Sequence, residues 1–130
     1  MFTINQIKEA HVKVKSGADF PKYVQDIKAL GVLRYEHFVC DGHIRYSGQE
    51  GVTLSADAKW QARAIAAKSD TGQLKHLLAM HQQGQTSYAT FCEQCAGAGV
   101  EKWVVDMVGM TCIYYDLAGN EMVVETIPAL

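Results

Sequence analysis

The chain has little of what membrane, disordered or nucleic-acid-binding proteins require. Only two of its 130 residues are proline, and 48% are hydrophobic, which excludes collagen-like and disordered classes. No apolar run is long enough to span a membrane. The first six residues have neither the basic end nor the apolar run of a signal peptide, so we expect a cytoplasmic protein. A net charge of −2, with scattered Lys and Arg, argues against a general nucleic-acid binder.

The length and the pattern together predict one α+β domain covering residues 1–130. A globule of this size buries roughly two-thirds of the surface that its unfolded chain exposes, which is enough for a core without disulfides. Helical spacing and β-rich runs occur in turn along the chain. We therefore expect an antiparallel sheet of five or six strands, covered on one side by helices.

An internal repeat is the strongest signal in the sequence. Residues 2–54 and 69–127 align as two copies of one helix–helix–hairpin unit, without a gap from Phe20 over Tyr88 onward. Matched pairs in this alignment include Tyr23 with Phe91, Gly31 with Gly99, Arg34 with Lys102, Tyr35 with Trp103, and Tyr46 with Tyr114. The joining segment, residues 55–68, is rich in alanine, and we expect it to be a helix packed on the sheet.

The first helix of each copy begins at a capping box. The capping pairs are Thr3 with Gln6 and Asp70 with Gln73, each followed at once by an apolar residue. We expect the first of these helices to end at about Lys15 or Ser16, and its counterpart to end at about Gln83.

The second helix of each copy has a cap and a closing glycine at matched positions. Asp19 and Ser87 are the expected N-caps, and Gly31 and Gly99 are suited to the left-handed position that ends a helix. After each glycine the pattern becomes β-rich. Residues 33–40 and 43–47 predict a hairpin whose Asp41-Gly42 pair favours a type I′ turn. The second copy predicts strands at 101–108, 111–116 and 121–127, and residues 51–54 are a weaker strand candidate.

Cys92 and Cys95 form a C-x-x-C, which raises zinc binding or dithiol chemistry. In the repeat they lie over Val24 and Ile27, on the apolar face of the matching helix. Free cysteine usually behaves as a small buried hydrophobe. We therefore interpret both as core residues and predict no metal and no cofactor, with zinc or redox chemistry as the weaker alternative.

The first hairpin is polar where the second is apolar. His37, Asp41, His43 and Arg45 lie there, and one or two histidines beside an acid could perform general acid–base catalysis. The structural alternative is a solvent-facing hairpin with no chemical role. No nucleophile elbow, phosphate loop or paired-carboxylate motif accompanies these residues.

The second hairpin carries apolar and aromatic side chains on both faces of its strands. Such strands are either covered on both sides within the monomer or form an interface between copies. The interface candidates are Trp103, Val105, Met107, Ile113 and Tyr115.

The chain resembles the YbcV-like family, which comprises small bacterial proteins of unknown function. The resemblance rests mainly on residues 81–86, Gly99 to Asp106, Met110 to Cys112 and Tyr114 to Asp116, and it extends over nearly the whole chain. Some members of that family are prophage-borne, and some carry the label of phage envelope protein, which implies a structural role in a virion. The resemblance brings no catalytic residues with it.

Two functions of different classes follow. The leading hypothesis is a non-enzymatic binding module, possibly dimeric, with an unknown protein or small-molecule partner. The alternative is a small metal-independent enzyme that uses His37, Asp41, His43 and Arg45.

Overall fold

A computed structural model describes residues 2–15 and 17–128 as an α+β fold, with four α-helices against a six-stranded antiparallel sheet. The strands are β1 (Arg34–Phe38), β2 (Ile44–Ser47), β3 (Thr53–Ala56), β4 (Val100–Asp106), β5 (Thr111–Asp116) and β6 (Glu121–Thr126). Their order in the sheet is β3-β2-β1-β4-β5-β6, so β1 and β4 meet at the centre. The predicted α+β class with an antiparallel sheet and the weak third strand are both confirmed.

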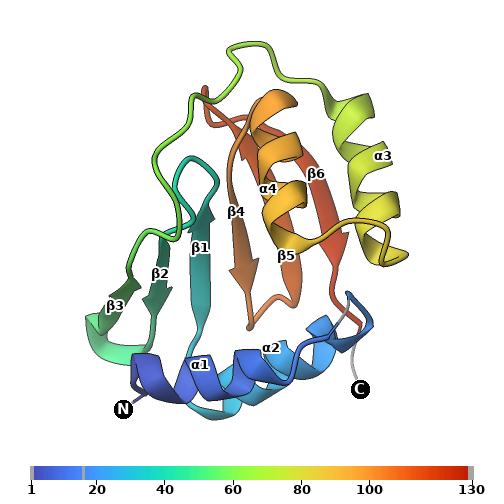
Figure 1. Cartoon of the computed structure of the whole chain (residues 1–130). Helices are drawn as coiled ribbons and strands as arrows, with labels where there is room; N and C mark the ends of the chain where they lie inside the picture. The colour runs from blue at the N-terminus through green and yellow to red at the C-terminus, as the bar shows by residue number, and fades with distance from the viewer. Residues whose placement is uncertain (1, 16, 129–130) are drawn as a thin grey trace.

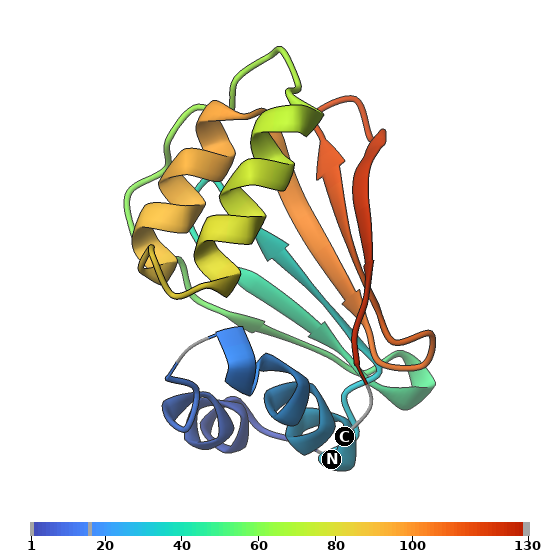
Figure 2. The same ribbon diagram turned by 90° about the vertical axis from the view of Figure 1, so that its right-hand side faces the viewer.

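The helices lie on one side of the sheet in two antiparallel pairs (Figures 1 and 2). α1 (Ile4–Val12) and α2 (Phe20–Ala29) lie across one end of the strands, whereas α3 (Thr71–Gln82) and α4 (Tyr88–Gly97) run along β4, β5 and β6. Short 3₁₀ turns occur at Gly17–Asp19 and Gln49–Gly51. The second side of the sheet carries no helix from the described residues (Figure 2).

The predicted capping residues start most of the helices. The Thr3 side chain accepts from the Gln6 backbone N–H, and the Gln6 side chain accepts from the Thr3 N–H at 2.9 Å, which completes the capping box. Asp70 and Ser87 also accept hydrogen bonds from backbone N–H groups in the first turns of α3 and α4. Asp19 makes no cap bond to α2, because its carboxylate accepts instead from the Lys15 N–H at 2.8 Å.

Two predicted boundaries differ from the structure. α1 ends at Val12, short of the expected Lys15, and Ser16 lies outside the described residues. The first hairpin does not close in a two-residue type I′ turn, because β1 ends at Phe38 and β2 begins only at Ile44. Within that connection Gly42 has a positive φ of 76°, whereas Asp41 does not.

The prediction of a helix at residues 55–68 is wrong. Residues 53–56 belong to β3, and residues 57–70, which we call the strap, form no helix or strand. The Lys59 and Trp60 N–H groups donate to the Asp41 carbonyl, the Arg63 N–H donates to Cys40, and the Ala66 N–H donates to Ala96. These partners lie in the first hairpin and in α4, so tertiary bonds replace the i→i−4 bonds that a helix would need.

The core lies between the helices and the sheet. Alternate strand residues point into it, among them Tyr35, Trp103, Val105, Cys112 and Tyr114, each at most 7% exposed. From the helices, Ile7, Val24, Ile27, Leu74 and Phe91 close the layer. Because the sheet period is two, the intervening strand residues face the other side, which we call the open face.

Candidate functional site

The structure does not bring the four residues of the predicted histidine site together. His37 points toward the helices and is 2% exposed. Arg45 pairs with Glu36 across the hairpin, so its side chain lies on the open face, opposite His37. Asp41 and His43 lie in the connection between the two strands. One substrate therefore cannot contact His37 and Arg45 together, and the catalytic alternative loses its geometric basis.

His37 is held in an aromatic box under α4. Its ring stacks on Trp103 with centroids 4.0 Å apart and an interplanar angle of 10°. Its Nε2 atom forms a short hydrogen bond with the Tyr88 hydroxyl, while Nδ1 is buried without a hydrogen-bond partner. Burial lowers the pKa of His37 from 6.5 to about 3, with a further contribution from the positive charge of Lys59. The ring is therefore neutral at physiological pH.

Asp41 and His43 form a separate surface pair. The Asp41 carboxylate accepts from the backbone N–H of His43 at 3.0 Å and contacts its Nδ1 at 2.5 Å. These contacts, led by the backbone hydrogen bond, lower the pKa of Asp41. The His43 ring in turn stacks on Phe38 with centroids 4.3 Å apart. The arrangement orders the hairpin end.

The open face has an apolar half and a charged half. One cross-strand row runs through Arg45, Glu36, Val104, Ile113 and Val124, as the strand registers place them side by side. Val124 is 54% exposed. The Glu36 carboxylate pairs with Arg34 at 3.1 Å and with Lys102 at 2.8 Å, and these two cations lower its pKa although burial opposes them.

Aromatic side chains of the open face lie close to two of its cations, Lys102 and Arg45. The Lys102 Nζ lies 5.7 Å from the ring centroids of both Phe38 and Tyr115, and the Arg45 guanidinium lies 5.9 Å from Phe38. These are distances at which cation–π attraction operates. The face thus combines aromatic, aliphatic and cationic groups that the strand pairing holds in fixed positions.

Three of the five predicted interface residues are core residues. Trp103, Val105 and Met107 are 7%, 0% and 0% exposed, because they point toward the helices and are covered by them. They cannot line an interface of the folded chain, and the prediction is wrong for these three. Ile113 and Tyr115 occupy the alternate positions and lie on the open face, partly exposed.

The four cysteines are free thiols, and three of them are buried. Cys92 and Cys95 are fully buried on α4, and Cys112 is 4% exposed on β5. Burial raises the pKa of Cys92 and of Cys112 to about 12 and also raises the pKa of Cys95. Across residues 2–15 and 17–128, no three His, Cys, Asp or Glu side chains are grouped so as to hold a metal ion.

We predict that the native protein reacts with a thiol reagent at Cys40 at most, because a buried, protonated thiol is not a nucleophile. All four cysteines should react once urea unfolds the chain. A timed reaction with a chromogenic disulfide measures this, and the Cys40→Ser variant is the control, since it should show no fast native reaction. Fast reaction of two or more thiols in the native protein would contradict the buried placement.

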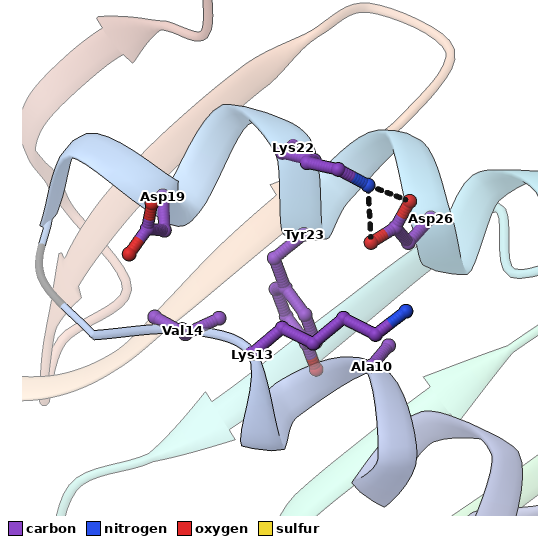
Figure 3. Close-up of a pocket in the computed structure, with 7 residues that line it drawn as sticks. All are labelled: Ala10, Lys13, Val14, Asp19, Lys22, Tyr23 and Asp26. Atoms are coloured by element: carbon purple, nitrogen blue, oxygen red, sulfur yellow. Dashed lines mark hydrogen bonds and ion pairs between the residues drawn. The ribbon is translucent and has the colours of Figure 1, made fainter.

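A small cavity of about 30 Å³ lies between α1 and α2 (Figure 3). Tyr23 reaches from α2 toward α1 there, and on the rim Lys22 pairs with Asp26 at 3.0 Å. Such a volume holds one or two water molecules. An adjoining shallow groove of about 260 Å³ shares Ala10, Lys13 and Asp26 with it, and it is smaller than usual ligand pockets.

Sequence reasoning missed the polar cluster between the strap and the first hairpin. The Trp60 indole N–H donates to the Cys40 carbonyl at 3.1 Å, and the Lys59 Nζ donates to the Gly42 carbonyl at 2.8 Å. A Cβ on Gly42 would lie 2.8 Å from the Trp60 ring, so this position needs glycine for space as well as for its φ. The available signal was Trp60 itself, a large aromatic residue in an otherwise small-residue stretch.

The fold and its surfaces define a small α+β protein with helices on one face of its sheet and a polar–apolar open face on the other. No helix of the described residues has the length and hydrophobicity needed to cross a membrane. Residues 8–126 match the family described as protein of unknown function (DUF1398), and the chain belongs to this family. It is similar to the Uncharacterized protein YcgX of Escherichia coli (strain K12), with 19% identity over 115 residues, 88% of this chain and 86% of that protein.

Proposed function

We propose that the chain is a non-enzymatic interaction module that pairs with a second copy of itself through the open face. The observation that carries this proposal is the row of Val104, Ile113 and Val124 on a sheet face that no described helix covers. Apolar residues that adjoin across three strands are costly to leave in water. A second copy removes them from water without any further partner.

The charges of the open face favour one arrangement of the two copies. A two-fold axis parallel to the strands, between β1 and β4, would set β1 of each copy over β4 of the other. Arg34 and Asp106 are cross-strand neighbours, so this axis brings Arg34 opposite Asp106 of the second copy. The same rotation brings Phe38 opposite Lys102 of the second copy and Arg45 opposite its Ile113. Arg34 thus meets the carboxylate of Asp106, and no two like charges lie opposite each other, which supports this axis.

The size of the face also suits a stable dimer. Strands spaced about 4.8 Å apart carry same-face residues about 6.7 Å apart, two on each of β2 and β3 and three on each of the others, and these cover about 500 Å² of flat area. Side chains make the accessible area larger than this flat area. A standard interface buries about 800 Å² from each partner.

The oligomeric state of an Ile113→Lys variant tests the proposal. We expect the wild-type chain to be a dimer at micromolar concentration and the variant to be a monomer, because the new ammonium would be buried opposite Arg45 of the second copy. Ile113 is only partly buried in the monomer, so the variant should fold. Light scattering and sedimentation measure the mass, and circular dichroism checks the fold.

The matched control is Val108→Lys, at a side chain that is 73% exposed in the turn after β4. This variant should stay dimeric. Ile113→Asp should weaken the dimer less than Ile113→Lys does, since the carboxylate would face Arg45 of the second copy. A monomeric wild-type chain, or dimers in all the variants, would overturn the proposal.

We also propose that the two halves of the chain arose by duplication, as the sequence repeat predicts. The strand registers support this: Tyr35 pairs with Tyr46, and Trp103 pairs with Tyr114, at the same offset of 68 positions. Both aromatic pairs have centroids 5.6 Å apart and an interplanar angle of 47°. The helix pairs depart from this symmetry, because one lies across the strands and the other lies along them.

We also propose that the protein is cytoplasmic and is related to the YbcV-like, prophage-borne proteins. The free thiols of all four cysteines support a reducing compartment. Membership of a family of unknown function and similarity to an Escherichia coli protein are compatible with the resemblance.

A further inference from the structure

We propose a binding site for the oxyanion group of a small carboxylate or phosphate, formed by Lys59 and Arg63 of the strap beside Tyr88 of α4. This site lies on the helix side of the sheet and is separate from the open face. The strap is fourteen residues of irregular chain, a length at which loops in compact domains usually have a function. Its hydrogen bonds to Asp41, Cys40 and Ala96 hold it in place over α4.

Lys59 and Arg63 of the strap have no carboxylate partner within the described part of the chain. The nearby Asp41 carboxylate is already engaged by His43. Arg63 stacks over the Trp60 ring at 4.8 Å, and its Nη1 atom is buried without an acceptor. A buried guanidinium N–H without an acceptor is costly, and an oxyanion is the acceptor whose charge and geometry match it.

The wall facing these cations supplies further polar atoms and no negative charge. The Tyr88 ring lies 6.0 Å from Trp60, and its hydroxyl contacts His37 Nε2 and the Cys92 thiol. His37 is 2% exposed and its Nδ1 atom has no partner. Arg63 and Tyr88 both adjoin the Trp60 ring, and Lys59 is its chain neighbour, so positive charge and polar atoms lie side by side at the strap.

Thermal unfolding with inorganic phosphate and with acetate, at ionic strength matched with sodium chloride, tests the site. We expect a saturable rise in Tm of several degrees with at least one anion, since a ligand that binds only the folded state stabilises it. A rise with phosphate alone would identify a phosphate ligand, and a rise with acetate alone a carboxylate. No rise with either anion would overturn the proposal.

Arg63→Gln should abolish the anion-dependent rise in Tm. Arg45→Gln is the matched control, because Arg45 lies on the open face and the rise should persist. Lys59→Gln provides a second variant at an exposed side chain that cannot disturb the core, and the rise should fall in it as well. An equal rise in wild type, Arg63→Gln and Lys59→Gln would show that the anion binds elsewhere.

Discussion

Replacing Gly99 with alanine should lower the free energy of unfolding by about 3 kcal/mol. Gly99 has a φ of +87°, where an L side chain costs about 1–2 kcal/mol. An added Cβ would also lie 2.7 Å from the Lys68 carbonyl oxygen and 2.7 Å from the Ser69 Cα, which are backbone atoms that cannot rotate away. Relieving that overlap costs a further 1–3 kcal/mol or so. Urea titration followed by circular dichroism measures the loss.

Gly119→Ala separates the two contributions. Gly119 has nearly the same φ, +84°, but a Cβ there would meet nothing within 4 Å. This variant should therefore lose only the conformational part, about 1–2 kcal/mol. Equal losses at both positions would mean that the close approach of the strap to Gly99 does not contribute to stability.

Local chemistry was sufficient to predict most of the regular elements. Thr3, Asp70 and Ser87 cap helices because their side-chain oxygens reach backbone N–H groups two or three residues on, a relation fixed within one turn. Gly31 and Gly99 have the expected positive φ for the same local reason. The covering of one sheet face by helices was also expected, but the second hairpin is apolar on both faces, so its buried set could not be predicted from alternation.

The strap could not be predicted from local propensity. Its alanines favour a helix in isolation, but the Trp60 ring packs on Gly42 and the Arg63 N–H bonds Cys40, both in a hairpin far away in the sequence. Such contacts are decided by which segments meet in three dimensions. The Asp41-Gly42 connection, which accepts the same tertiary bonds, is also longer than the expected two residues.

The split of the histidine site could have been predicted from the hairpin alone. A two-residue turn at Asp41-Gly42 would pair Arg45 with Phe38, and the observed register pairs it with Glu36. Both partners are an odd number of positions from His37, so both registers put His37 and Arg45 on opposite faces. The burial of His37 could not be predicted from the sequence, because it depends on contacts with Tyr88 and Trp103 in the second half of the chain.

The burial of His37 should make the protein sensitive to acid. Its pKa is about 3 in the folded chain and 6.5 ordinarily, so between these values the unfolded chain binds a proton that the folded chain does not. The contribution of His37 to the free energy of unfolding is therefore fully present above pH 6.5, and it is lost as the pH drops toward 3. A shift of this size corresponds to a loss of up to about 5 kcal/mol, at roughly 1.4 kcal/mol per pH unit.

A His37→Phe variant isolates this contribution from that of the carboxylates. Phenylalanine keeps a ring against Trp103 but loses the hydrogen bond to Tyr88, so we expect a loss of about 1 kcal/mol at pH 8. Below pH 6.5 its free energy of unfolding should fall less steeply than that of the wild type, and the two curves should cross. His76→Phe, at an exposed position on α3, should follow the wild-type curve. If the free energies of unfolding of the wild type and His37→Phe fell in parallel with pH, His37 would take up its proton in the folded chain. That result would contradict its burial under α4.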